Sequence, residues 1–300
     1  MRVAILINPR AGVPRPDAAA QRETIARDVL RTVGGDGQLI ISKGPGHARD
    51  VTASLVDTGV DAMVVWGGDG TINEVASQLV YRDIPLGIVP AGSGNGLARE
   101  LGLEWNERRA LETALHGSIR QIDAGELGGR FFFNVAGVGL DARLAEVFNA
   151  RKRRGIRGYV GSLLGELRRY EPRRYTIRID GLSVEKKALI VALANTRQYG
   201  NRAIIAPLAK PDDGLLDLVV VPPLSPLSTL WHARRLITGT VHGLSDALMH
   251  TVREGEIAAD GSLTFHVDGE VVAGTSVLSI KIHPRALAVR VPVGSAASHH

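Results

Sequence analysis

The sequence contains no cysteine among its 300 residues. It therefore cannot form a disulfide framework, a thiolate metal site or a thiol nucleophile. Long apolar runs are also missing, because the longest, Ala188–Ala194, is far too short to cross a bilayer. The chain begins with a predicted strand, Arg2–Ile7, and lacks the charged and then apolar order of a signal peptide. These absences predict a cytoplasmic protein.

Acidic residues are fewer than basic ones, and the formal net charge is +5. The positive charge concentrates between Arg143 and Arg178, a stretch with eleven Arg and Lys and three Glu. This stretch is either a solvated helical face or a surface that binds anionic lipid head groups, where each basic residue contributes about 1 kcal/mol. Few aromatic residues are interleaved with the arginines, so nucleic acid is not expected as a partner. We expect peripheral binding to the anionic inner face of a membrane.

In the first third of the chain, near-continuous apolar segments alternate with helical patterns. This alternation predicts a parallel sheet covered on both faces, as in a Rossmann-like α/β domain, over residues 1–120. The predicted strands are Arg2–Ile7, Gln38–Ile41, Asp61–Trp66 and Ile84–Val89, and the predicted helices are Asp17–Val33, His47–Thr58, Thr71–Val80 and Asn106–His116.

After Ile119, β-branched segments separated by Asp-Gly turns predict an antiparallel β domain over residues 121–295. Its last strand is a candidate to return to the first domain, and pairing of its sheet edges would give a homodimer. The predicted strands are Arg120–Glu126, Phe131–Val135, Arg174–Asp180, Glu185–Ala194, Leu215–Val221, Leu263–Val267, Val271–Val272, Val277–His283 and Ala286–Val291. Helices are predicted at about Ala142–Tyr170 and Ser228–Thr240.

The most informative stretch runs from Val64 to Val75 and reads Val-Val-Trp-Gly-Gly-Asp-Gly-Thr-Ile-Asn-Glu-Val. A strand that stops at glycines and opens into a helix is suited to phosphate. Glycine has no Cβ to hold an anion away, and its N–H is free to point inward. The helix N-terminus adds unpaired N–H groups. Because Asp69 would repel phosphate unless a cation lies between them, the stretch predicts phosphate together with a divalent cation.

Two more small-residue loops follow predicted strands. Asn8–Gly12 follows the first strand, and Pro90–Arg99, which reads Pro-Ala-Gly-Ser-Gly-Asn-Gly-Leu-Ala-Arg, follows the fourth. The carboxyl ends of parallel strands meet at one edge of the sheet, where ligands of such sheets bind. Each loop alone is an ordinary turn, but three of them at one edge predict a polyphosphate ligand.

Taken together, these motifs resemble the diacylglycerol kinase catalytic-domain family, which includes bacterial lipid kinases and sphingosine kinases. The resemblance covers nearly the whole chain, because Asp212–Asp217 and Asp268-Gly269-Glu270 follow in the family's order and approximate spacing. It implies the NAD kinase and diacylglycerol kinase-like fold, with ATP bound between the α/β domain and the β domain. It also implies an ATP- and Mg²⁺-dependent kinase whose acceptor is the hydroxyl of a lipid such as diacylglycerol or a sphingoid base.

The resemblance further implies a nucleotide site on the first domain. Asp69 would organise the catalytic metal–water network, since phosphoryl transfer needs charge neutralisation and positioning more than covalent chemistry. The residues that it places around ATP are Asn8, Pro9, Arg10, Ala11, Gly12, Ser42, Gly67, Gly68, Asp69, Gly70, Thr71, Ile72, Asn73 and Ser93.

The motif Asp268-Gly269-Glu270 lies between two short β segments and on its own is an ordinary hairpin turn. In the family, the matching glutamate is the base that accepts the proton of the lipid hydroxyl. The resemblance thus implies that Glu270 is the catalytic base. A carboxylate can serve in this way if burial raises its pKa and the proton moves late in the reaction.

The segment Asp212–Asp217 also has two interpretations, a turn into a strand or part of a metal site. In bacterial members of the family, the matching segment holds a structural Mg²⁺ through one carboxylate and backbone carbonyls, and oxygen-only ligation suits that ion. The resemblance therefore implies Mg²⁺ ligands at Lys210 and Leu215, through their carbonyls, and at Asp213, through its side chain.

The chain departs from the family at Gly96, where many diacylglycerol kinases carry Asp. Asp123 matches another acidic family position and is a candidate to substitute in part. Two alternatives to a lipid kinase stay open, namely NAD kinase and a non-catalytic regulator that binds nucleotide or lipid. The histidines show no paired metal spacing and are interpreted as structural or surface residues. They are His47, His116, His232, His242, His250, His266 and His283.

Overall fold

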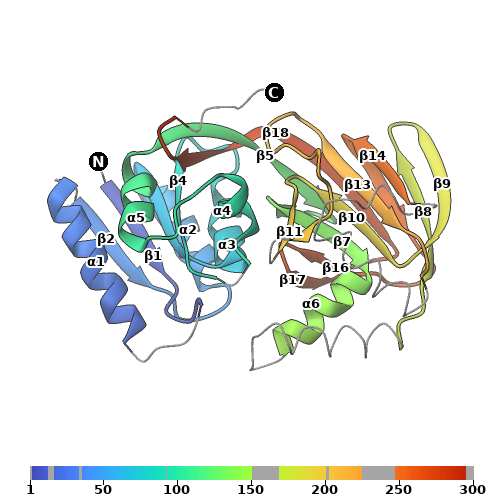
Figure 1. Ribbon diagram of the computed structural model, residues 1–300, viewed down its shortest axis with the longest axis horizontal. Coiled ribbons are helices and arrows are strands. Elements are labelled where there is room, and N and C mark those ends of the chain that lie inside the picture. Colours follow the sequence, from blue (N-terminus) through green and yellow to red (C-terminus); the bar gives the residue numbers. More distant parts are fainter. Residues whose placement is uncertain are drawn as a thin grey trace. The chain divides into compact units, whose positions relative to one another are not determined.

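The computed structural model describes residues 2–12, 17–33, 36–92, 94–150, 169–200, 203–224 and 247–294 (Figure 1). The chain divides into two compact units. The first contains the described residues up to Ile122 together with those from Arg285 onward, and the second runs from Asp123 to Pro284. Strands β5 (Ser118–Leu127) and β18 (Val277–Val291) both pass from one unit into the other.

The first unit is built on a parallel sheet with the strand order β2-β1-β3-β4-β18. The alternation of strands and helices expected from the sequence is confirmed. Its remaining strands are β1 (Arg2–Ile7), β2 (Asp36–Ile41), β3 (Ala62–Gly67) and β4 (Leu86–Pro90). Its helices are α1 (Ala18–Val33), α2 (His47–Thr58), α3 (Asp69–Leu79), α4 (Gly96–Glu100) and α5 (Glu107–His116).

Helices cover both faces of this sheet, as a parallel sheet requires. On one face, alternate residues of β1 and β3, such as Ile5 and Val64, pack against α1 and α5 in one buried cluster. The other face meets α3, whose Ile72, Val75 and Leu79 are buried. Strands β1 (after Arg2), β3 and β4 are buried along their length, whereas the edge strand β2 is partly exposed. In a sheet of this kind, ligands bind at the loops that follow the carboxyl ends of the strands.

The second unit contains antiparallel strands in two main sheets and a short two-stranded one. One main sheet has the order β18-β15-β8-β9, with β5 paired to β18 and to β6, and the other has the order β14-β13-β10-β7-β16-β17. The strands are β6 (Arg130–Phe132), β7 (Val135–Gly139), β8 (Arg173–Ile179), β9 (Leu182–Ala188), β10 (Ile190–Ala194), β11 (Gln198–Gly200), β12 (Ala203–Ile204), β13 (Leu216–Val221), β14 (Leu248–Val252), β15 (Glu254–Ala258), β16 (Thr264–Val267) and β17 (Glu270–Ala273).

The two main sheets pack face to face, which confirms the antiparallel β domain. Tyr175 and Ile177 of the first sheet share a buried core with Leu216 and Leu218 of the second. The opposite face of the second sheet packs against helix α6 (Leu140–Ala150) and forms a separate buried cluster. Figure 1 shows α6 beside β16 and β17, which it contacts.

The structure corrects several predicted elements of the second unit. The predicted strand Glu185–Ala194 is two strands, β9 and β10, which belong to different sheets. The predicted strand Phe131–Val135 is also divided, between β6 and β7. The two strands predicted at Val277–His283 and Ala286–Val291 are one strand, β18, which continues past Arg285 although its φ is 50°.

Some further elements were not predicted at all, and others begin or end at residues different from those predicted. Strands β14 and β15 were not predicted, and each has at most two β-branched residues among its five. In the first unit, α3 begins at Asp69, two residues before the predicted start. The predicted helix Ala142–Tyr170 begins as α6, and its residues 151–168 lie outside the described part of the chain, as does the predicted helix Ser228–Thr240.

Candidate functional site

The first glycine turn, Gly67–Gly70, joins the end of β3 to the start of α3. Gly68 is the N-cap of α3, and as a glycine it supplies no side-chain acceptor to the helix. A Cβ on Gly67 would lie 2.8 Å from Cβ of Thr71, whereas a Cβ on Gly70 would meet nothing within 4 Å. The start of α3 thus lies at the carboxyl end of the sheet without a capping side chain of its own. This is the backbone geometry that binds phosphate.

The carboxylate of Asp69 connects the first glycine turn to the second, between Gly92 and Gly96. Its Oδ2 accepts the N–H of Asn95 at 2.7 Å, and its Oδ1 accepts the N–H of Gly96 at 2.9 Å. The turns also touch directly, because a Cβ on Gly92 would lie 2.7 Å from Cα of Gly68. Asp69 therefore has a structural task beside the catalytic one predicted for it. Since the backbone of Gly96 makes this contact, no side chain at that position is needed for it.

The second turn is closed by its own asparagine. Asn95 is fully buried and has a left-handed backbone, with φ 49° and ψ 53°. Its Oδ1 accepts the N–H of Gly92 at 3.1 Å, and its Nδ2 donates to the carbonyl of Gly92 at 2.7 Å. Ser93, a predicted nucleotide residue, lies outside the described residues. The hydrogen bonds of Asn95 keep the turn compact where Asp69 holds it.

Arg22, on α1, organises the first loop and was not among the predicted site residues. Its buried guanidinium donates to the carbonyl of Asn8 at 2.7 Å and to that of Ala11 at 3.1 Å. A signal was present in the sequence, because Arg22 lies four residues before Ala26, on the face of α1 that is buried. An arginine on an apolar helical face needs acceptors, and here two loop carbonyls provide them.

The predicted residues of the first loop differ in exposure. Asn8 and Pro9 are half-buried, Arg10 is exposed and Ala11 is buried. The Nδ2 of Asn8 donates to Oγ1 of Thr71 at 2.7 Å, so this loop is tied to α3. Gly12 has φ 82°, and a Cβ there would lie 2.5 Å from the carbonyl oxygen of Ala91, the residue before the second glycine turn. All three loops of the predicted nucleotide site are therefore in mutual contact.

Two predicted residues of α3 are directed into the protein. Ile72 is buried in the core and its N–H donates to the carbonyl of Gly68 at 3.0 Å, so a ligand cannot reach its side chain. Asn73 is also buried, and its Oδ1 accepts a hydrogen bond from Ser77 at 3.3 Å. These two residues therefore anchor the first turn of α3 in the protein interior and do not contact a ligand through their side chains.

Glu74 caps the N-terminus of the neighbouring helix α2, a role that was not predicted from the sequence. Its carboxylate accepts the N–H groups of Gly46, Ala48 and Arg49, at 2.8, 3.1 and 3.3 Å, at the start of α2. A bound carboxylate already satisfies these donors, which leaves the start of α3 as the better place for an anion. Ser42 is the residue predicted from this part of the sheet edge, and its hydroxyl donates to the carbonyl of Gly44 at 3.4 Å.

In the second unit, Asp268-Gly269-Glu270 forms the turn from β16 into β17. Asp268 and Gly269 have φ values of 48° and 85°, as in the tight hairpin turn expected from the sequence. The carboxylate of Asp268 accepts the N–H groups of Phe133, Asn134 and Val135, at 2.9, 2.9 and 3.1 Å. Glu270 is exposed, in contrast to the burial invoked in its prediction. The turn is therefore anchored by Asp268, while the side chain of Glu270 is accessible.

The predicted metal segment is anchored by Asp123, which is fully buried. The N–H of Asp123 donates to the carbonyl of Pro211 at 2.6 Å, and its Oδ2 accepts the N–H of Gly214 at 2.7 Å. These bonds shape the loop that carries Lys210, Asp213 and Leu215. Asp213 is exposed, and its Oδ1 accepts the N–H of Leu215 at 3.1 Å.

Carboxylates crowd at this loop. Partial desolvation of its carboxylate raises the pKa of Asp213 although the residue is exposed overall, and burial followed by the charge of Asp213 raises the pKa of Asp217 to about 6. A hard cation would relieve the repulsion between them, so the donors present fit Mg²⁺ or Ca²⁺. The described residues contain no group of three or more His, Cys, Asp or Glu side chains that could hold a metal. Binding would therefore depend on Asp213 and on the carbonyls of Lys210 and Leu215.

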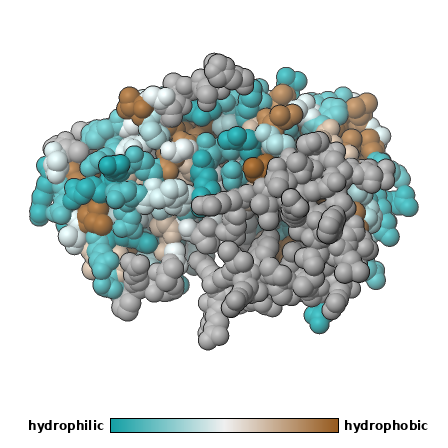
Figure 2. Space-filling model, in the orientation of Figure 1, coloured by the Kyte–Doolittle hydropathy of each residue, from teal (hydrophilic) through white to brown (hydrophobic). Residues whose placement is uncertain are grey.

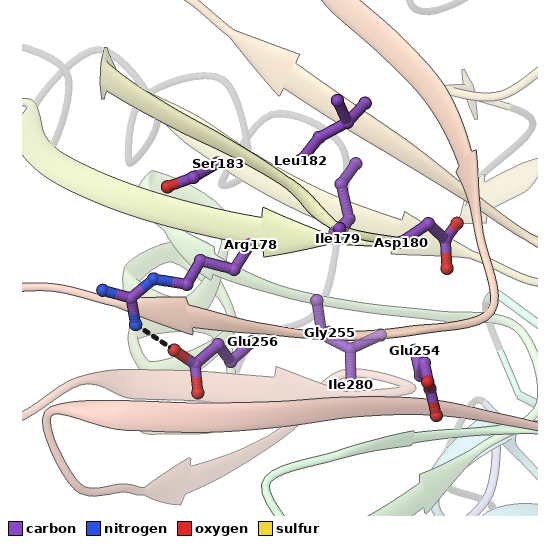
Figure 3. A pocket seen from close by; sticks show the side chains of 10 residues that line it. Arg178, Ile179, Asp180, Leu182, Ser183, Glu254, Gly255, Glu256 and Ile280 are labelled. Atoms are coloured by element: carbon purple, nitrogen blue, oxygen red, sulfur yellow. Dashed lines mark hydrogen bonds and ion pairs between the residues drawn. The ribbon is translucent and has the colours of Figure 1, made fainter.

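A shallow hollow of about 560 Å³ lies at the turn between β8 and β9. Figure 3 shows Arg178 directed toward Glu256 of the adjacent strand β15, and the two form an ion pair. None of the predicted site residues lines this hollow. It is therefore separate from the candidate sites.

No helix within the described ranges is long and apolar enough to cross a membrane. On the face shown in Figure 2, apolar side chains of the described residues lie in small groups among polar ones. Exposed large apolar residues occur in both units, for example Trp105 in the first and Leu208 in the second.

Comparison with protein families gives two matches that together span most of the chain. Residues 2–127 match the family described as diacylglycerol kinase catalytic domain. Residues 134–291 match the YegS C-terminal NAD kinase beta sandwich-like domain.

Curated relatives cover most of this chain. A protein named "Diacylglycerol kinase" from Mycobacterium tuberculosis (strain ATCC 25618 / H37Rv) is 35% identical over 233 residues, which are 73% of this chain and 72% of the relative. A "Probable lipid kinase YegS-like" protein from Chromohalobacter salexigens is 31% identical over 296 residues, 93% of this chain and 91% of the relative.

A solved structure, described as a diacylglycerol kinase from Bacillus anthracis str. Sterne, superimposes with a TM-score of 0.78. The superposition covers 97% of this chain and 96% of that chain, at 22% identity. At this identity the likeness concerns the fold, which is the same in the two proteins.

Proposed function

This chain belongs to the diacylglycerol kinase family of lipid kinases, and from that premise we propose that it transfers the γ-phosphoryl group of ATP to a lipid hydroxyl. The acceptor class that we propose is diacylglycerol or a sphingoid base. The observation that carries the proposal is that Asp69 and Asn8 join three strand-end loops at the start of α3, while Arg22 holds the first of these loops.

The nucleotide phosphates would bind at these loops. Backbone N–H groups at the start of α3 and in the glycine turns are donors that suit phosphate oxygens. Asn8 and Thr71, which are hydrogen-bonded to each other, border the same place, and Arg10 extends from the first loop as an exposed cation. Because Asp69 and Asn95 hold the two glycine turns together, the donors are positioned before the substrate arrives.

Mg²⁺, when bound, would neutralise charge on the phosphoryl group during transfer. Asp69 is the residue proposed to hold this ion or its water ligands. Oδ2 of Asp69 accepts the N–H of Asn95 and Oδ1 accepts that of Gly96, and the two oxygens of an ionised carboxylate offer about four lone-pair sites. Asp69 can therefore hold the second turn and serve the metal at the same time.

Glu270 is the proposed base toward the acceptor hydroxyl. Its accessible carboxylate can receive the proton as the oxygen attacks phosphorus, when the acidity of the hydroxyl is greatest. The neighbouring Asp268 fixes the position of the turn, because its carboxylate accepts the N–H groups of Phe133 and Asn134. We also propose that the enzyme works at the inner face of the cytoplasmic membrane through the basic segment Arg151–Arg174, most of which lies outside the described residues.

Incubation of the purified protein with [γ-³²P]ATP, Mg²⁺ and a mixed lipid extract tests the proposal. We expect a labelled lipid, whose identity mass spectrometry would then establish. Parallel reactions with NAD as the acceptor test the alternative of NAD kinase, for which labelled NADP is the product. Absence of labelled lipid under all conditions, with ATP bound, would contradict the proposed acceptor class.

A structural cation at Asp213 is expected to stabilise the protein in a pH-dependent way. The pKa of Asp217 is raised from 3.8 to about 6, so its ionised carboxylate lowers the free energy of unfolding. This destabilisation is fully present above pH 6 and disappears as the pH falls toward 4. Mg²⁺ would offset this cost. We therefore expect added Mg²⁺ to raise the melting temperature more at pH 7.5 than at pH 5.

Asp213→Asn should remove most of this gain, because it removes the only side-chain ligand of the proposed set. The matched control is Asp180→Asn, which changes an exposed turn aspartate in the same unit and should respond to Mg²⁺ like the parent. Differential scanning fluorimetry measures the shift. An equal shift in Asp213→Asn and in the parent would place the cation elsewhere.

A further inference from the structure

We propose that His266 is a positioning residue for the turn Asp268-Gly269-Glu270, called the catalytic turn below. His266 holds this turn by accepting the N–H of Gly269. The inference rests on the proposed role of Glu270, the residue that follows Gly269. From the sequence alone, His266 is expected to be a structural or surface residue. The structure gives it a specific neighbour on each ring nitrogen, Asp141 on one side and the turn on the other.

The pair formed by His266 and Asp141 is buried. His266 lies on β16 and is 6% exposed, and Asp141, the second residue of α6, is 5% exposed. A Cβ on Gly137, in β7, would lie 2.4 Å from Oδ2 of Asp141, so glycine at that position leaves room for the carboxylate. Oδ1 of Asp141 accepts the N–H of Ala142 at 2.7 Å. Buried polar groups are costly unless paired, and here each side chain provides the partner of the other.

The hydrogen-bond partners assign the tautomer of His266. The N–H of Gly269 donates to Nδ1 at 3.4 Å, so Nδ1 is an acceptor and carries no proton. Nε2 must then carry the proton, which it donates to Oδ2 of Asp141 at 3.2 Å. The carboxylate selects the tautomer that presents a lone pair to the turn.

The catalytic turn is thus held at two successive residues. The carboxylate of Asp268 receives three backbone N–H groups from residues 133–135, and the N–H of Gly269 is bound by His266. The N–H of Gly269 belongs to the peptide that joins it to Asp268, so His266 fixes the orientation of that peptide. His266 limits rotation at Gly269 and so limits the directions that Glu270 can take. A displacement of about 1 Å at a reacting group can lower a rate about a hundredfold.

Two substitutions separate the ring nitrogens of His266. His266→Asn places an amide oxygen near the position of Nδ1, so it can still accept from Gly269, although it does not reach Asp141. His266→Gln extends to the position of Nε2 and can still donate to Asp141, but it offers no acceptor to Gly269. We expect kcat to fall at least tenfold in His266→Gln and less than threefold in His266→Asn, with the KM for ATP unchanged in both.

The matched control is His283→Gln. His283 is also buried in the second unit and is paired with a carboxylate, Glu126, at 2.8 Å. We expect its kcat to equal that of the parent, whatever the change in melting temperature. An equal loss of kcat in His266→Gln and His283→Gln, or in His266→Gln and His266→Asn, would overturn the proposal. Imidazole ¹⁵N spectra should show a protonated Nε2 and a bare Nδ1 at His266, and the opposite tautomer would overturn it as well.

Failure of this inference is distinguishable from failure of the proposed function. If His266→Gln keeps full activity while Glu270→Gln loses it, Glu270 is the base and His266 does not position it. If Glu270→Gln keeps full activity, the role of Glu270 itself is wrong.

Discussion

Replacement of Glu270 by Gln is expected to remove phosphoryl transfer and to leave ATP binding intact. Glutamine is nearly isosteric with glutamate but cannot accept a proton from an alcohol. Loss of a general base lowers turnover by about 10²- to 10⁴-fold. Because Glu270 is exposed and the anchoring side chain of the turn is Asp268, the substitution should change the melting temperature little. Single-turnover transfer and isothermal titration with ATP measure the two properties separately.

The control for this prediction is Glu254→Gln. Glu254 is also exposed and is also the first residue of a strand in the second unit, β15, but it is not in the turn. It should retain the activity of the parent. Full activity of Glu270→Gln under the same conditions would show that another group accepts the proton.

Replacement of Asp69 by Ala is expected to weaken ATP binding and also to lower turnover. The substitution leaves the N–H groups of Asn95 and Gly96 without their acceptor and separates the two glycine turns. Hydrogen bonds to a charged group contribute ~1.5–3 kcal/mol each. We expect the Kd for ATP to rise about a hundredfold, which is ~3 kcal/mol, and turnover to fall further because the metal loses its proposed carboxylate.

Asp57→Ala is the matched control for Asp69→Ala. Asp57 is an exposed helical aspartate of the same unit, in α2. Titration calorimetry with ATP and a steady-state assay compare the two variants with the parent. An unchanged Kd for ATP in Asp69→Ala would mean that the two turns do not need the carboxylate to form the nucleotide site.

The first unit could be predicted closely because its signals are local. Strand β3 is buried at every residue, and a fully buried strand is recognisable as a continuous apolar run bounded by glycine. Helix α5 begins after Asn106, whose side chain accepts the N–H of Arg109 at 3.1 Å, and such a cap is also recognisable in the sequence. Neighbouring residues decide these features, so the sequence pattern is sufficient.

The second unit was harder to predict because sheet membership depends on distant strands. Residues Glu185–Ala194 look like one strand, but β9 pairs with β8 while β10 pairs with β7 and β13. The sequence did contain a signal for this division. The charged residues of β9, which are exposed, give way to the uniformly apolar residues of β10, which are buried. Strand β18 was predicted as two segments on either side of Pro284 and Arg285, although the strand is continuous there. Proline usually interrupts a ladder of hydrogen bonds.

The sequence by itself determined the fold class, the order of the glycine motifs and hence the family and its type of chemistry. These depend on residue types at short spacings, which a single chain displays directly. The tertiary structure alone decided which groups hold the site together. Asp69 meets Asn95 across 26 residues, Asp141 meets His266 across 125, and Asp268 meets Phe133 across 135. Hydrogen bonds at such separations exist only once the sheets have brought distant segments together, so no local pattern predicts them.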